Sequence, residues 1–153
     1  MYKRQVCETI IEDYFDRNIW KKSATECGVL ETIEVDGETM TVKLDTGNSA
    51  NACALHADSY EVRGKVVHFE RNGKKYKKPL VRELTLIKPP ETRPVVMCEL
   101  NFLNTIYEQE VSLDQRGKIP FLANRDFMNR ANLMINPSRK FLLTNKHDTS
   151  EED

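Results

Sequence analysis

The chain has 153 residues, enough for one domain with a real core, since a chain of this length can bury about 70% of its unfolded surface. The 23 basic and 24 acidic side chains nearly cancel, which excludes a strong overall field towards nucleic acid or a membrane surface. No apolar run is long enough to span a membrane, and the acidic, interrupted N-terminus lacks the apolar region of a signal peptide, so we expect a cytoplasmic protein.

The first segment predicts an amphipathic helix over residues 2–20. Its apolar side chains recur at helical intervals with charges between them: Tyr2, Val6, Ile10, Ile11, Tyr14 and Phe15. This helix could pack on its own domain, bridge a dimer or dock on a partner. Residues 21–28 predict a linker, and the acidic end of the chain predicts a disordered tail. We therefore divide the chain into a helix and linker (1–27), one domain (28–147) and a tail (148–153).

From residue 29 the apolar period changes to two, which is typical of strands. The predicted strands pair as three hairpins: Val29–Val35 with Glu38–Leu44, Val66–Arg71 with Lys74–Lys78, and Leu84–Ile87 with Pro94–Phe102. Ile106–Leu113 pairs next. Asp36-Gly37 marks the first turn, and Asn72-Gly73 favours a tight primed turn in the second. Short strands at this spacing, with few helices, predict a mainly β fold, a small barrel or sandwich.

The most informative motif, Asp45-Thr46-Gly47, closes the apolar strand Thr41–Leu44 and precedes small polar residues. A tight loop at a strand end carries the aspartate to water, and the glycine lets the backbone approach closely. The threonine hydroxyl can bond across to a facing loop. The tripeptide alone is equally typical of an ordinary polar turn.

Further segments follow the motif in a fixed order. Ile119–Met128 predicts an apolar strand, a polar turn and a short helical start, and Leu133–Leu143 predicts two short strands around Pro137-Ser138. Three more stretches narrow the pattern: Ala54–Ala57, Glu91–Val96 and Glu110–Asp114. Over about Gly28–Leu143, the chain resembles the retropepsin-like family labelled as ATP-dependent zinc proteases, which includes the RimB-type peptidases. The resemblance implies a retropepsin-like, small closed barrel with short helices.

The chain departs from the family pattern near both motifs. Ala123-Asn124-Arg125 stands where the family has a hydrophobic-Gly-Arg step, and asparagine best tolerates a left-handed backbone among the other residues. The loop after Gly47 is about two residues longer than in the family, an estimate from the motif spacing alone. Lys88-Pro89-Pro90-Glu91 replaces a flexible tip, and prolines would stiffen a segment that retropepsins use as a flap.

The resemblance implies an aspartic peptidase that acts as a homodimer. One chain carries one Asp-Thr-Gly, so two copies of Asp45 must meet, and like charges that close share one proton. The ionised carboxylate would draw a proton from water while the protonated one polarises the scissile carbonyl. Thr46 of each loop would brace the pair across the dimer.

Residues outside the motif have supporting roles in this interpretation. Arg125, next to Asp126 at the helical start, is expected to anchor the loop or the dimer interface by bidentate hydrogen bonding, although an exposed surface arginine would give the same pattern. Asp114 and Arg116 match an acid-x-Arg pattern of the family and are expected to fix a turn. His56 either lines the substrate site or is an ordinary loop or strand residue.

A basic cluster raises the question of substrate. Lys74, Lys75, Lys77, Lys78 and Arg82 lie within nine positions, with Arg93 across the next hairpin. Alternation sends Lys75 and Lys77 to one face of their strand. They either protect a sheet edge or, with His56 and Arg93, bind an acidic peptide. RimB-type relatives remove poly-glutamate tails, which implies a glutamate-rich substrate.

The cysteines and histidines give no metal-binding pattern. Cys7, Cys27, Cys53 and Cys98 include no Cys-x-x-Cys pair, and no His-Glu-x-x-His or glycine-rich phosphate loop occurs. We therefore expect reduced thiols, no metal and no cofactor, which argues against a zinc hydrolase. The sequence predicts an aspartic endopeptidase acting on peptides or proteins; the alternative is a catalytically silent binding or assembly module of the same fold.

Overall fold

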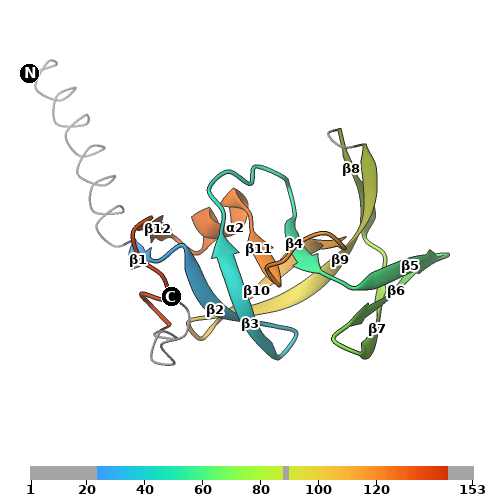
Figure 1. Ribbon diagram of the computed structural model, residues 1–153, viewed down its shortest axis with the longest axis horizontal. Coiled ribbons are helices and arrows are strands. Elements are labelled where there is room, and N and C mark those ends of the chain that lie inside the picture. The colour runs from blue at the N-terminus through green and yellow to red at the C-terminus, as the bar shows by residue number, and fades with distance from the viewer. Residues whose placement is uncertain (1–23, 88–89, 145–153) are drawn as a thin grey trace, which may run out of the picture.

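The computed structural model describes residues 24–87 and 90–144 (Figure 1). The predicted helix over residues 2–20, the first two residues of the Lys88–Glu91 tip and the predicted acidic tail lie outside these ranges.

Six strands form a closed barrel, so the prediction of a mainly β, small barrel fold is confirmed. The strands are β2 (Leu30–Val35), β3 (Glu38–Leu44), β4 (Cys53–His56), β9 (Glu91–Phe102), β10 (Thr105–Asp114) and β11 (Phe121–Ala123). They follow the order β10-β4-β11-β3-β2-β9, and the pairing of β9 with β10 closes the ring. Strand β8 (Arg82–Leu86) extends β9 as an antiparallel hairpin beyond the barrel (Figure 1).

The three predicted hairpins are confirmed as β2–β3, β6–β7 and β8–β9. Both predicted turn pairs have positive φ at each position, at Asp36 (50°), Gly37 (83°), Asn72 (51°) and Gly73 (79°). Such primed turns match the right-handed twist of the flanking strands, so local turn residues fix the register here.

Alternating burial along the strands builds the core of the barrel. On β3, buried Met40, Val42 and Leu44 alternate with more exposed neighbours, as expected for a strand with one face inside. Other strands contribute further core side chains: Ile33, Val35, Leu55, Val96, Cys98, Leu100, Val111, Leu113 and Phe121. Each large apolar side chain buried in this way contributes about 1.5–3 kcal/mol.

A second, three-stranded sheet lies beside the barrel (Figure 1). It consists of β5 (Ser59–Arg63), β6 (Val66–Arg71) and β7 (Lys74–Pro79). Its buried side chains include Val67 and Phe69, and the ring of Phe69 stacks on Tyr76 at 5.1 Å between centroids. The sequence did not predict β4 or β5 as strands, because β4 has only four residues and β5 is polar and largely exposed.

Two predictions at the ends of the domain are wrong. Part of the predicted linker forms β1 (Thr25–Cys27), which pairs in parallel with β12 (Leu133–Ile135). The second strand predicted within Leu133–Leu143 does not form, and Phe141 has φ of 54°. The first error arises because parallel pairing between segments more than 100 residues apart leaves no local sequence signal.

Glu31 holds the last described segment in place. Strand alternation turns this side chain inward, where it is fully buried. Its carboxylate accepts bonds from the backbone N–H groups of Gly28, Leu143 and Thr144 and from the Thr144 hydroxyl, at 2.7–3.0 Å. These donors replace water around a buried charge, which makes the carboxylate tolerable there and excludes a regular strand at residues 141–144.

Candidate active site

The Asp45-Thr46-Gly47 motif leaves the barrel at the carboxyl end of β3. Strand β11 runs parallel to β3, with Ala123 opposite Leu44, so the next residues of both strands emerge at one end of the barrel. Helix α2 (Arg125–Arg130) begins directly after β11. This topology brings Arg125 beside the loop at residues 45–52, which we call the Asp45 loop.

Within the Asp45 loop, backbone N–H groups hold the turn. The Asp45 side-chain oxygen Oδ1 accepts a bond from Gly47 N–H at 3.1 Å, and the Asp45 carbonyl accepts one from Asn48 N–H at 2.9 Å. An added Cβ at Gly47 would lie 3.4 Å from Asp45 Oδ1 and meet nothing closer. The chain itself therefore tolerates a small side chain at Gly47. The close approach of another backbone segment, for which a glycine was expected, does not occur among the described residues.

Two residues after β11 anchor the loop from outside. Arg125 donates from Nε to the Thr46 carbonyl at 2.6 Å, and its backbone N–H donates to the Asn48 carbonyl at 3.0 Å. Arg125 thus holds the loop as expected, but through one side-chain bond to a carbonyl rather than a bidentate pair. Its neighbour Asp126 is exposed in the first turn of α2, where a negative charge favours the helix N-terminus.

Asn124 makes the second anchor and corrects an expectation. Its φ is −93°, so the predicted left-handed turn is absent. The buried side chain instead donates from Nδ2 to the Ala50 carbonyl at 2.9 Å and accepts from Phe127 N–H at 2.9 Å, which caps α2. The Cys53 thiol also donates to its Oδ1 at 3.4 Å. The Asn124 amide therefore joins the Asp45 loop, helix α2 and β4.

The Asp45 carboxylate itself is half-buried and forms no ion pair with any described residue. Gly47 N–H is its one hydrogen-bond donor within the described chain. Thr46 is exposed beside it. A carboxylate with free acceptor capacity, fixed on a braced loop, can bind water, a proton or a second acid group.

A hollow of about 370 Å³ that the sequence did not predict adjoins the Asp45 loop. Its lining residues are Thr46, Arg125, Met128, Asn129, Leu133, Met134 and Ile135. The apolar part of this lining comes from α2, which follows β11, and from β12, which pairs with β1.

Asp114, Arg116 and Arg93 form an ion-pair network with Glu91. Arg116 N–H donates to Asp114 Oδ1 at 2.9 Å, the turn-fixing contact that was expected. Arg93 contacts Glu91 at 2.7 Å and Asp114 at 3.4 Å, and the Arg116 guanidinium also pairs with Glu91. The Arg93 side chain is only 14% exposed. Its charge is therefore neutralised within the fold, which leaves little of it for the predicted role in substrate binding.

His56 lies towards the other end of the barrel. Its backbone N–H donates to the Pro120 carbonyl at 2.8 Å, and its ring nitrogen Nε2 lies 3.3 Å from Asp58. The backbone N–H of Asn72, and then His56, lower the pKa of the Asp58 carboxyl. The hollow beside His56 is lined by Glu38, Arg71 and Lys118 but by no residue of the Asp45 loop.

The basic strand also lies away from the Asp45 loop. On β7, Lys75 and Lys77 are exposed on one face, as alternation predicted, while Lys78 on the other face pairs with Asp36 at 3.0 Å. Asp36 and Asp45 flank opposite ends of β3, a separation of roughly 20 Å or more at 3.3 Å per residue. The described residues of one chain therefore do not form the predicted basic groove beside Asp45.

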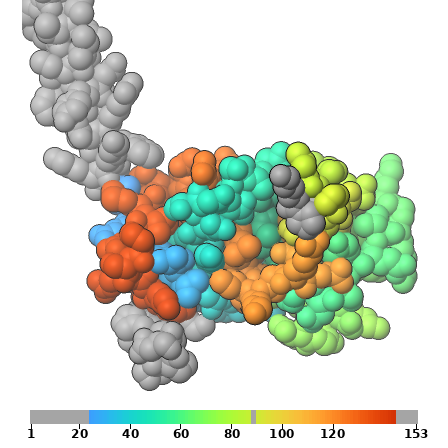
Figure 2. Space-filling model, turned by 45° about the horizontal axis from the view of Figure 1, so that its top comes forward, coloured from blue at the N-terminus to red at the C-terminus, as the bar shows by residue number. Residues whose placement is uncertain are grey.

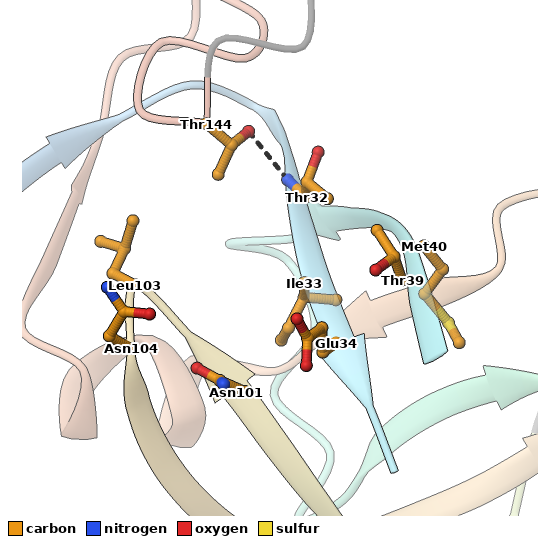
Figure 3. A pocket seen from close by; sticks show the side chains of 9 residues that line it. All are labelled: Thr32, Ile33, Glu34, Thr39, Met40, Asn101, Leu103, Asn104 and Thr144. Atoms are coloured by element: carbon orange, nitrogen blue, oxygen red, sulfur yellow. Dashed lines mark hydrogen bonds between the residues drawn. The ribbon is translucent and has the colours of Figure 1, made fainter. Parts of the chain in front are cut away.

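A larger hollow, of about 550 Å³, lies on the outside of β2 (Figure 3). Thr144 reaches across one side of it, where its hydroxyl accepts a bond from Thr32 N–H at 3.0 Å. Figure 3 shows Glu34, Asn101 and Asn104 around the remainder. No residue of the Asp45 loop lines this hollow, so its size alone does not identify the functional site.

The fold defines the chain as a closed β-barrel protein, and comparison with solved structures agrees. A Legionella pneumophila protein described as of unknown function (DUF785) superposes with a TM-score of 0.64 at 23% sequence identity, over 78% of this chain and 98% of that one. At this identity the likeness shows the fold. No protein-family model matches the sequence, and no curated protein matches it.

Residues 24–87 and 90–144 bear on two further classes, metal-binding proteins and proteins with membrane-spanning helices. No group of three or more His, Cys, Asp or Glu side chains is placed to hold a metal ion there. In the same part of the chain, no helix has the length and apolar character needed to cross a membrane.

Proposed function

We propose that the protein is an aspartic endopeptidase that acts as a homodimer. In this proposal, Asp45 of each chain contributes one carboxylate to a shared site. Two carboxylates side by side hold one proton between them, because both cannot ionise at that distance. The ionised one activates a water molecule for attack on a peptide carbonyl, and the protonated one polarises that carbonyl.

One observation carries the proposal: a half-buried, unpaired aspartate on a loop that Asn124 and Arg125 hold in place. The loop is braced through its main-chain carbonyls, by Arg125 at Thr46 and by Asn124 at Ala50, so that neither brace uses the carboxylate. A catalytic group needs this combination of fixed position and free acceptor capacity. The exposed side chain of Thr46 is available for the cross-dimer contact that the retropepsin resemblance implies.

The proposed substrates are peptides or proteins. A preference for acidic or glutamate-rich sequences rests on the family resemblance, since Lys75 and Lys77 lie away from the loop. The hollow beside Thr46, with Met128, Leu133 and Ile135 in its lining, favours an apolar side chain next to the scissile bond.

The alternative is a catalytically silent binding or assembly module of the same fold. The observation in its favour is that the Asp45 loop of one chain carries a single carboxylate. Without a second carboxylate, the loop can bind a partner but cannot divide the acid and base roles between two groups.

The test is peptide hydrolysis by purified Asp45→Asn protein. This change keeps the shape of the side chain and removes the titrating group, so we expect hydrolysis to fall by about three orders of magnitude or more. Cleavage of a mixed peptide library, read by mass spectrometry, gives the measurement without a known substrate. The matched control is Asp58→Asn, an exposed carboxylate towards the opposite end of the barrel, which should keep wild-type activity.

Thermal unfolding of both variants shows whether they are folded. Near-full hydrolysis by folded Asp45→Asn would exclude the aspartic mechanism. Absence of hydrolysis by the wild-type dimer over the whole acidic range, across the library, would favour the binding module.

A further inference from the structure

The Asp45 loop has a third anchor, which comes from the β8–β9 hairpin. Arg82, the first residue of β8, donates from Nη2 to Asn51 Oδ1 at 2.9 Å and to the Asn51 carbonyl at 3.4 Å. The same guanidinium donates from Nε to Glu110 Oε1 at 2.9 Å. Arg82 therefore binds the loop and β10 at the same time.

The register of the barrel explains why these three residues meet. Glu110 lies opposite Met97 of β9, and the next residue, Val111, lies opposite Cys53 of β4. Glu110 of β10 therefore lies beside the start of β4, where the Asp45 loop ends. Arg82 lies opposite Val95, two residues further back on β9. Figure 2 shows the loop (teal) and the hairpin (yellow-green) side by side on one face of the molecule.

We propose that Arg82 is a positioning residue that fixes the Asp45 loop against the β8–β9 hairpin. The catalytic part of this inference rests on the proposed function; the tether itself does not. Arg125 and Asn124 hold the first two-thirds of the loop from the α2 side, and Arg82 holds its last part from the opposite side. Loss of Arg82 leaves the loop fixed on one side only, so the direction of the Asp45 carboxylate varies.

The planar guanidinium binds two partners at once. Nε donates to Glu110 Oε1, and Nη2 lies 2.9 Å from the same oxygen while it donates to Asn51 Oδ1. The ammonium of lysine lacks this fork of two nitrogens, so it cannot grip Glu110 from both while it binds Asn51. The ion pair with Glu110 also explains why Arg82 does not act with the lysines of β7 as a basic surface. Its charge is neutralised at the barrel rim.

Partial exposure makes this tether weak and reversible. The side chains of Arg82 and Glu110 are each 33% exposed, so solvent and salt screen their attraction. The hairpin and the Asp45 loop therefore separate more readily at high ionic strength, while the uncharged Asn124 anchor is unaffected.

Amide hydrogen exchange tests the tether without reference to activity. In full-length Arg82→Met, we expect exchange in residues 46–52 to become about 5- to 10-fold faster, as for loss of one partly exposed attachment, with no change at the β2–β3 turn. Arg82→Lys keeps the charge and should keep the thermal midpoint, yet it should show the same faster exchange. The matched control, Arg63→Met, removes an exposed arginine that pairs with Glu61 on β5 and should leave the loop unchanged.

A double variant links the effect to the observed contact. Asn51→Ala should reproduce the faster exchange. Arg82→Met added to it should give little more, because both changes remove the bond between Arg82 and the Asn51 side chain. Unchanged exchange in Arg82→Met, or an increase spread over the whole barrel, would overturn the tether.

Kinetics test the positioning role. For Arg82→Lys, kcat should fall about 5- to 10-fold with KM within about 2-fold, because transition-state alignment is lost while peptide binding is kept. Faster exchange with unchanged kcat would overturn the positioning role and leave the tether. Retained activity in Asp45→Asn would instead reject the proposed function, and the exchange result would still decide the tether.

Discussion

The two ends of strand β3 are stabilised in different ways. At its first residue, charged side chains neutralise each other: Glu38 binds Arg71 at 2.8 Å and the Tyr76 hydroxyl at 3.0 Å. Beyond its last residue, side-chain donors bind main-chain carbonyls of the Asp45 loop and leave the Asp45 carboxylate unpaired. Ion pairs at the first end therefore hold the second sheet on the barrel, whereas the Asp45 carboxylate at the other end forms no ion pair with the described residues.

Two arginines, one at each end of β3, differ most clearly in what they bind. Arg71 is 6% exposed and gives its donors to Glu38 and to the His56 carbonyl, so it stabilises the fold. Arg125 is exposed and gives Nε to the Asp45 loop. If the two ends differ as described, removing one arginine should lower stability and removing the other should lower activity.

The largest effect on stability is expected from Arg71→Met. The change leaves Glu38 and the His56 carbonyl without their donor, and we expect a loss of about 2–3 kcal/mol in the free energy of unfolding, less than for a fully buried pair because Glu38 is 31% exposed. Urea unfolding gives the measurement. Arg63→Met, in a pair with both side chains 64% exposed, is the control and should cost at most about 0.5 kcal/mol. A larger cost for Arg63→Met than for Arg71→Met would reverse the assignment.

Arg125→Met should show the opposite pattern. It removes one hydrogen bond at an exposed position, so the unfolding free energy should fall by less than about 1 kcal/mol. Because the Asp45 loop loses its anchor at Thr46, kcat for peptide hydrolysis should fall about 10-fold. Kinetics at saturating peptide, compared with Arg71→Met assayed well below its melting temperature, make the contrast. Equal kcat in the two variants would show that the loop anchors do not distinguish the two ends.

Two buried thiols provide a smaller test, one at each end. Cys53 contacts Asn124 beneath the Asp45 loop, and Cys98 lies near Asp36. Burial raises the pKa of each thiol from its ordinary value of 9.0 to about 12. The folded state therefore keeps a proton that the unfolded chain loses above pH 9. The stabilisation is complete below pH 9 and decreases as the pH rises from 9 towards 12.

We expect each thiol to account for a loss of about 1 kcal/mol in unfolding free energy between pH 8 and pH 10. Urea unfolding of Cys53→Ala and Cys98→Ala in reducing buffer should show a flatter pH dependence than the wild type, by similar amounts. An unchanged pH dependence in either variant would mean that its thiol already ionises in the folded protein.

The sequence predicted features that depend on neighbouring residues. Asp36-Gly37 and Asn72-Gly73 set two hairpins through their own backbone preferences, and the start of α2 follows from Asn124-Arg125 after an apolar strand. The position of Asp45 at a strand end was equally local. The expectation that Arg125 lies at the loop came from the family resemblance, and its contact with the Thr46 carbonyl depends on the distant pairing of β3 with β11.

Features set by distant pairing could not be predicted in this way. Strand β1 pairs with β12, and Arg82 meets Asn51 only because β4, β9 and β10 share one register. The expectation that the lysines of β7 line the substrate groove comes from the acidic substrate that the family resemblance implies, whereas the ion pair of Lys78 with Asp36 holds that strand at the other end of β3. The backbone preference of asparagine predicts a left-handed turn at residue 124. Its side-chain bonds to the Asp45 loop and to the start of α2 determine its role instead.

The central claim is that Asp45 residues of two chains make one catalytic site. Mixing wild-type protein with folded Asp45→Asn protein, at constant total concentration and after subunit exchange, tests it most directly. If each site needs two carboxylates, mixed dimers are inactive, and peptide hydrolysis should fall as the square of the wild-type fraction. Hydrolysis that falls in simple proportion to the wild-type fraction would mean that each chain works alone, and would contradict the claim.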